Sequence, residues 1–125
     1  MTQRITPYLL YEDAEAAVEF VTRAFGFREV DRAVGAAGGL HVELEGPSGG
    51  QLYLGQPPAG YEGPAKVGQT SLVHVLVEDV DAHHERAKAA GATIVEELVD
   101  TPFGHRRYTC DDPQGHEWSF AQVVP

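Results

Sequence analysis

Two copies of one stretch decide the fold of this chain: Glu45-Gly46-Pro47-Ser48-Gly49-Gly50-Gln51-Leu52-Tyr53-Leu54 and Asp111-Asp112-Pro113-Gln114-Gly115-His116-Glu117-Trp118-Ser119-Phe120. The two prolines lie 66 positions apart, and so do Gly49 and Gly115. Proline presets φ for a turn and glycine supplies a positive φ, so each copy predicts a turn between two strands. A fixed period of this kind indicates an internal repeat.

The repeat extends over both halves of the chain. Asp13 and Asp79, again 66 positions apart, each precede a helical pattern as N-caps, and Gly26 and Gly91 follow these helices as C-caps. Strands are expected at residues 5–11, 27–34, 40–45 and 51–54, and again at 70–77, 93–98, 106–110 and 117–123. The sequence therefore predicts an α+β domain of two β-α-β-β-β modules, residues 1–55 and 70–125. Residues 56–69, with three prolines, are expected to form a linker.

Composition limits the classes of partner. The 125 residues are 42% hydrophobic, enough for a packed core, and carry a net charge of −10. That charge disfavours nucleic acid and anionic membranes, and it attracts cationic small molecules, although an acidic surface also simply keeps a protein in solution. No apolar run approaches a membrane span and no signal peptide is evident. Cys110 is the single cysteine, so a cytoplasmic protein without a disulfide is expected.

The alternation of side chains along the strands separates two faces of each sheet. The apolar set, which should lie under the helix, comprises Val42, Leu44, Leu52, Leu54, Tyr108, Cys110, Trp118 and Phe120. If both sheets curve around a central cleft with helices outside, polar and aromatic residues of the other faces converge there. Such a cleft is typical of a small-molecule site. The candidate ligand-binding residues are Tyr8, His41, Glu43, Tyr53, His74, Arg107, Glu117 and Ser119.

Several of these residues have alternative roles. Tyr8 and Tyr53 could stack on an aromatic or cationic ligand, or pack at a dimer seam. His74 could bind a ligand and titrate near neutral pH, or be a solvated histidine. Arg107 could clamp a ligand carboxylate or pair with Glu117. A displaced metal site could combine His41, Glu43, His74 and Glu117, the alternative being a solvated sheet face.

Three other histidines are assigned structural positions. His83 and His84 are expected on a helix, facing solvent or partly packed. His116 lies inside the second turn and is expected to cap it.

The chain resembles the vicinal oxygen chelate superfamily, the group of glyoxalases, bleomycin resistance proteins and extradiol dioxygenases. The resemblance rests on residues 7–13, 24–27, 75–81 and 112–120, the last with the pattern D-P-x-G-x-x-W-x-F. Metal-dependent members place four ligands at positions that here hold Thr6, Tyr53, Leu72 and Ser119. None of these is a good ligand for a divalent metal.

The resemblance therefore implies the metal-free, bleomycin-resistance-like branch, which is similar to homodimers whose halves pair across subunits. The expected function is sequestration of an antibiotic-like or cationic ligand in a dimer cleft, without metal, cofactor or catalysis. The alternative is a metal-dependent lyase, isomerase or dioxygenase with non-standard ligands. In a third reading, the cleft is only a dimer seam filled by the protein's own side chains.

Overall fold

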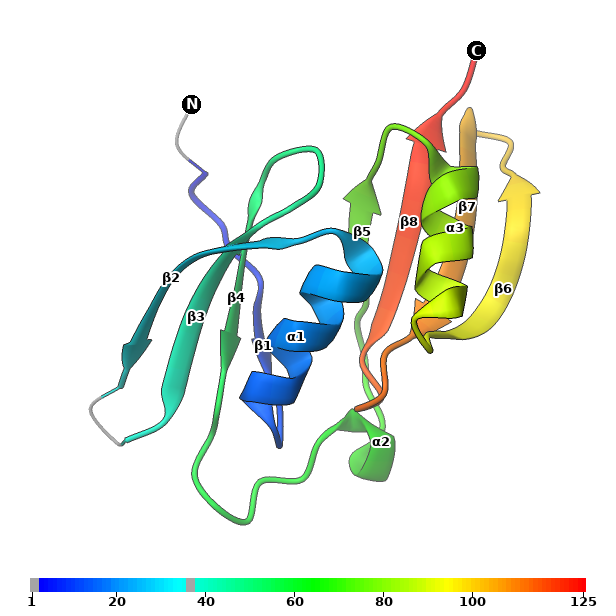
Figure 1. Cartoon of the computed structure of the whole chain (residues 1–125). Coiled ribbons are helices and arrows are strands. Elements are labelled where there is room, and N and C mark those ends of the chain that lie inside the picture. Colours follow the sequence, from blue (N-terminus) through cyan, green and yellow to red (C-terminus); the bar gives the residue numbers. More distant parts are fainter. Residues whose placement is uncertain (1–2, 36–37) are drawn as a thin grey trace.

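Each half of the chain forms its own four-stranded sheet (Figure 1). The computed structural model describes residues 3–35 and 38–125. The first sheet has the order β1-β4-β3-β2 and the second the order β5-β8-β7-β6. In chain order the elements are β1 (Tyr8–Leu10), α1 (Ala14–Phe25), β2 (Arg28–Val34), β3 (Leu40–Glu45), β4 (Gln51–Gly55), α2 (Pro64–Val67), β5 (Val73–Leu76), α3 (Val80–Ala89), β6 (Thr93–Asp100), β7 (His105–Asp111) and β8 (Glu117–Val123).

The two sheets share one pairing scheme. β1 runs parallel to β4, and β5 runs parallel to β8, while the other neighbouring strands are antiparallel. Tyr8 lies opposite Tyr53 in the first sheet, and His74 lies opposite Ser119 in the second. These pairs are related by the 66-residue period, so the repeat predicted from the sequence is present in the strand register. The opening strands β1 and β5 are shorter than expected, since they span only residues 8–10 and 73–76.

Both long helices begin where the sequence predicts, and α1 also ends as predicted, at Gly26; the expectation for the end of α3 was wrong by one residue, because its C-cap is Ala90 and not Gly91. The Asp13 carboxylate accepts a hydrogen bond from the Ala16 amide (3.1 Å), and the Asp79 carboxylate accepts one from the Ala82 amide (3.1 Å). Each satisfies an N–H group that the first helical turn leaves without a partner. After α1 the chain turns at Gly26, whose φ of 80° is the left-handed conformation that favours glycine.

The short helix α2 was not predicted, because it lies in the proline-rich segment treated as a linker. It begins at Pro64, a residue suited to the first helical position. The segment is held by Glu12 of the first half, which accepts hydrogen bonds from the Gly63 amide (2.8 Å) and from Lys66 Nζ (2.8 Å). This tie spans more than fifty residues, so no local pattern could indicate it.

The halves meet through their helical sides. α1 packs against α3, and the Phe25 ring lies against Trp118 (5.1 Å between centroids) and Phe120 (4.7 Å). The predicted apolar face is confirmed: all eight residues belong to one buried core. Hydrogen bonds also join the C-terminal ends of α1 and α3. Arg86 Nε donates to the Arg23 carbonyl (2.9 Å), and Arg23 Nη1 donates to the Ala90 carbonyl (3.2 Å). The sheet faces that carry no helix are left for other contacts.

The expectation for the two neighbouring histidines of α3 was wrong, because His83 and His84 are both buried. His83 Nε2 donates to the Phe25 carbonyl (2.9 Å), which can only accept, so Nδ1 accepts from the Tyr108 hydroxyl (2.6 Å). Burial lowers the pKa of His83, which keeps the imidazole neutral. The histidine therefore joins the two halves at the core. Within the described part of the chain, no helix is long and apolar enough to cross a membrane.

Candidate functional site

Four of the predicted residues meet on the helix-free face of the first sheet, here called the first open face: Tyr8, His41, Glu43 and Tyr53. His41 Nε2 lies 3.1 Å from Glu43 Oε2, and His41 Nδ1 lies 2.6 Å from the Tyr8 hydroxyl. A carboxylate only accepts, so in a neutral imidazole Nε2 donates to Glu43 and the phenol donates to Nδ1. The Tyr53 ring stands edge-on to both partners, with centroids 5.7 Å from Tyr8 and 5.1 Å from His41.

Gly55 makes this arrangement possible. It lies opposite His41 in the register of β3 and β4, and the Tyr8 ring crosses directly over it. A Cβ atom at position 55 would come within 2.7 Å of the Tyr8 ring. A glycine in a strand indicates such a close approach, but the strand was expected to end at residue 54, so Gly55 was not recognised as a strand residue from the sequence.

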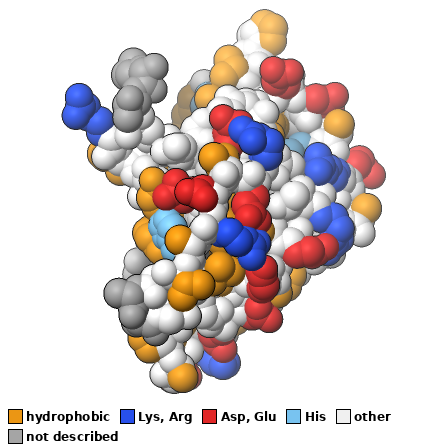
Figure 2. Space-filling model, turned by 60° about the vertical axis from the view of Figure 1, so that its left-hand side comes forward, with side chains coloured by type: hydrophobic (Ala, Val, Ile, Leu, Met, Phe, Trp, Pro, Cys, Tyr) orange, Lys and Arg blue, Asp and Glu red, His pale blue; other side chains and the backbone are white. Residues whose placement is uncertain are grey.

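The first open face is aromatic and acidic. Tyr8 is 48% exposed, and the other three members are partly exposed. Figure 2, which turns the first sheet forward, shows acidic and histidine side chains among hydrophobic ones on this side. Aromatic faces and a carboxylate together favour a cationic group with an apolar body.

A second group lies on the helix-free face of the second sheet, here called the second open face: His74, His105, Arg107, Thr109 and Ser119. His74 Nδ1 lies 3.1 Å from the Ser119 hydroxyl, and the His74 and His105 rings stack with centroids 5.9 Å apart. Burial lowers the pKa of His74, and the charges of His105 and Arg107 lower it further. His105 was missed, since the strand was expected to begin one residue later.

The proposed pairing of Arg107 with Glu117 is wrong. Arg107 Nη2 donates instead to Glu96 on β6, at 3.1 Å. Glu117 lies away from this pair, on the wall of a pocket at the seam of the two halves.

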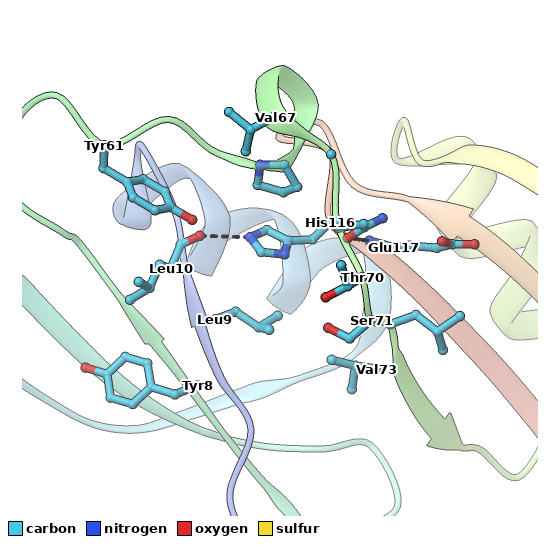
Figure 3. Close-up of a pocket in the computed structure, with 14 residues that line it drawn as sticks. Tyr8, Leu9, Leu10, Tyr61, Val67, Thr70, Ser71, Val73, His116 and Glu117 are labelled. Atoms are coloured by element: carbon cyan, nitrogen blue, oxygen red, sulfur yellow. Dashed lines mark hydrogen bonds between the residues drawn. The ribbon is translucent and has the colours of Figure 1, made fainter.

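That seam pocket, of about 310 Å³, lies between β1 and the segment between α2 and β5 (Figure 3). Tyr8 and Glu117, both predicted, line it, together with Tyr61 from the segment before α2. Tyr61 was not foreseen as a lining residue, because the linker carries no repeat that places its side chains. In this pocket Tyr8 of the first open face and Glu117 of the second half line the same space.

The expectation that His116 caps its turn was wrong, because the Asp112 carboxylate accepts from the turn amides and the His116 side chain points to the first half. Its Nε2 donates to the Leu10 carbonyl (2.8 Å), and its ring packs on Tyr11 with centroids 4.4 Å apart. Figure 3 shows this bond beside the pocket, between the turn that precedes β8 and the Leu10 carbonyl of β1. The second turn is thereby fastened to the first half.

The eight predicted residues are not drawn into one cluster. Among the hydrogen bonds, ion pairs and ring contacts of residues 3–35 and 38–125, none joins Tyr8, His41, Glu43 or Tyr53 to the second open face. In these described ranges no three His, Cys, Asp or Glu side chains are grouped to hold a metal ion. Of the displaced metal set, only His41 and Glu43 touch each other.

Two β-α-β-β-β modules joined in one chain, each with a polar and aromatic face free of helix, define a glyoxalase-type protein. The family described as Glyoxalase/Bleomycin resistance protein/Dioxygenase superfamily matches residues 4–120. The chain belongs to this superfamily.

Relatives and solved structures agree with that assignment. An uncharacterized protein of Mycobacterium bovis is 36% identical over 96% of this chain and 83% of its own length. TioX from Micromonospora sp. ML1 is 35% identical with a TM-score of 0.77, over 98% of this chain and 100% of its own. TnmS3, an antibiotic binding protein from Streptomyces sp. CB03234, is 21% identical with a TM-score of 0.75, over 99% and 98% of the two chains. The similarity to TnmS3 shows a shared fold alone.

Proposed function

We propose that this protein binds and sequesters a cationic, antibiotic-like small molecule in a cleft between two copies of the chain, without metal and without catalysis. The observation that carries the proposal is the first open face, where Tyr8, His41 and Tyr53 pack around one another next to the Glu43 carboxylate. We further propose that it does so in the cytoplasm, where a lone reduced cysteine such as Cys110 is expected.

Charge and ring geometry support a cationic aromatic ligand. Tyr8 and Tyr53 stand at 90° to each other, so a flat ligand group can lie on one ring face while touching the edge of the other. Glu43 lies beside them and offers a fixed negative charge at one end of the face. The net charge of −10 raises the local concentration of cations around the whole molecule.

Exposed apolar side chains on the two edge strands support a homodimer. β1 and β5 each end their sheet, and both carry exposed apolar residues on the open faces: Tyr8 and Leu10 on β1, Leu76 on β5, and Leu72 just before it. Covering such side chains is favourable by about 25 cal/mol per Å² of apolar area. A second copy would cover them and bring a first open face against a second open face of opposite character.

The solved structures support the proposal only by analogy of fold. TnmS3, which has a similar fold, is described as an antibiotic binding protein. A shared fold does not fix chemistry, so the proposal depends on the side chains of the open faces.

The test is titration calorimetry with bleomycin-type compounds. Binding is expected for the unchanged protein, and Glu43→Gln should weaken it by about tenfold or more, since a charge-assisted contact contributes about 1.5–3 kcal/mol. Glu45→Gln is the matched control, because Glu45 lies on the same strand but is held in an ion pair with Arg28 (2.7 Å). No heat with any bleomycin-type compound at high concentration would remove this class of ligand.

The rival function, a metal-dependent lyase, isomerase or dioxygenase, has a separate test. Its strongest support is the His41–Glu43 pair, which supplies two ligand types side by side. Elemental analysis of the purified protein decides between the two functions. Stoichiometric Ni, Zn, Fe or Mn that is lost in His41→Ala would favour the enzyme.

Homodimerisation is tested on its own by light scattering after gel filtration. The unchanged chain should elute as a dimer and Leu76→Glu as a monomer, because the charge would fall on the apolar edge. A monomer in both cases contradicts the dimer cleft.

A further inference from the structure

The two open faces occupy the same positions of the repeat but carry opposite chemistry. Residues 66 positions apart take the same place in each sheet, which pairs Tyr8 with His74, His41 with Arg107, Glu43 with Thr109 and Tyr53 with Ser119. The first member of each pair is aromatic or acidic, apart from His41. The second member is basic or carries a hydroxyl group. A ligand that touches both faces therefore meets two different environments.

The second open face concentrates basic side chains in an acidic protein. The His74 and His105 rings stack almost in parallel, with an interplanar angle of 15°, and neither has a carboxylate partner within the described residues. Arg107 lies close enough for its charge to act on His74. Three cationic or ionisable nitrogenous groups that face one another repel when protonated, and an anion between them relieves that repulsion.

The arginine on this face keeps unused donor capacity. Its single ion pair is the 3.1 Å contact from Nη2 to Glu96, a carboxylate that is 47% exposed. Its Nε is buried and has no hydrogen-bond partner in the described structure. A planar guanidinium with free donors is suited to a second oxyanion, because carboxylate and phosphate oxygens accept two parallel N–H bonds.

The carboxylates on the elements around this face do not pair with its two histidines. Glu96 on β6 offsets part of the Arg107 charge and also accepts from the Thr109 hydroxyl (3.5 Å). Glu117 on β8 lies in the seam pocket. Arg106, the neighbour of Arg107, is bound to Asp81 (2.8 Å) and Asp100 (3.2 Å) instead.

We propose that the second open face binds an oxyanion, a carboxylate or phosphate group, through Arg107, His74 and His105. Resting on the function proposed above, this makes the ligand bipolar: an aromatic cationic part lies on the first open face and an anionic group on the second. Ser119 orients His74 through the 3.1 Å contact with Nδ1, which leaves Nε2 toward the ligand.

The test uses inorganic phosphate and nuclear magnetic resonance of the imidazole protons. His74 and His105 signals are assigned from single His→Asn variants and titrated with pH, in phosphate and in sodium chloride of equal ionic strength. Phosphate should raise the pKa of both imidazoles and leave that of the buried His83 in place. Arg107→Gln should weaken phosphate binding about tenfold. Arg106→Gln, the matched control, should leave it unchanged.

A second titration with acetate distinguishes the two sources of the oxyanion. A stronger effect of acetate assigns the site to a carboxylate, and a stronger effect of phosphate assigns it to a phosphate. Imidazole pKa values that do not respond to either anion overturn the proposal, as does an equal response in Arg107→Gln. These readouts need no cationic ligand, so a failure to bind bleomycin-type compounds and a failure of the anion site are separate results.

Discussion

The Asp112 carboxylate should be the most sensitive single group for stability. It is almost fully buried and accepts four hydrogen bonds. Oδ1 accepts from the backbone amides of Gln114 (3.0 Å) and His116 (3.1 Å), and Oδ2 accepts from Tyr11 Oη (2.7 Å) and Trp118 Nε1 (3.1 Å). The first pair shapes the second turn, and the Tyr11 bond joins this turn to the other half of the chain.

Asp112→Asn keeps the size of the side chain and one acceptor oxygen. The amide NH₂ then replaces Oδ2 and faces two donors. The Tyr11 hydroxyl can rotate and accept, but the Trp118 N–H cannot, so it stays buried without a partner. A hydrogen bond to a charged group contributes about 1.5–3 kcal/mol and a neutral one about 0.5–1.5 kcal/mol. The Trp118 bond is lost and the Tyr11 bond becomes a neutral one, so the free energy of unfolding should fall by about 2–4 kcal/mol. This is a large part of the about 5–15 kcal/mol typical of a domain.

The assay is urea unfolding followed by the fluorescence of Trp118, the single tryptophan. Both proteins are measured at equal concentration, because dimerisation would contribute to the apparent stability. Asp111→Asn is the matched control: Asp111 has its pKa raised by burial and by Asp112, so neutralising it should cost little. Tyr11→Phe should give about half of the Asp112→Asn effect. Equal midpoints for the Asp111 and Asp112 variants would refute this reasoning.

Three further predictions concern the core and the helix ends. Burial lowers the pKa of His83, so the folded state binds fewer protons than the unfolded state. The free energy of unfolding should therefore decline as pH falls through the ordinary imidazole pKa of about 6.5. Urea midpoints measured across this pH range should decline less in His83→Gln. Burial raises the pKa of Cys110 to about 12, so a thiol reagent should label it only in denaturant, and rapid labelling of the native protein would contradict its burial. Arg86→Ala should destabilise by about 1–2 kcal/mol by thermal unfolding, while Arg28→Ala, which removes a surface ion pair, should change stability by less than about 1 kcal/mol.

The parts of the fold that follow local rules could be predicted from the sequence. Asp13, Asp79 and Gly26 mark helix ends, because capping depends on residues within one turn. The alternation in β4 and β8 separates buried from helix-free faces, because the period of a strand is fixed at two. The same alternation predicted that Tyr8 and Tyr53 lie on one face of the first sheet, and the register of β1 and β4 places them opposite each other.

Contacts between distant residues could not be predicted in the same way. Arg107 pairs with Glu96 rather than Glu117, because the register of β7 and β8 places Arg107 opposite Ala121, whereas Glu117 lies opposite Asp111. His83 is buried because the end of α1, far away in the sequence, presents the Phe25 carbonyl to it. The repeat describes each half separately and says nothing about how the halves pack.

The sequence by itself determined two equivalent modules, their caps and the face of each strand that turns from the helices. These features depend on the backbone geometry of neighbouring residues, which the amino acids at positions such as Asp13 and Gly26 set directly. The tertiary structure decided how the modules join, with Asp112 and His116 fastened to Tyr11 and Leu10 about a hundred residues away. It also decided that the first open face and the second open face stay separate, because the halves bury their helical sides against each other and leave those faces outward.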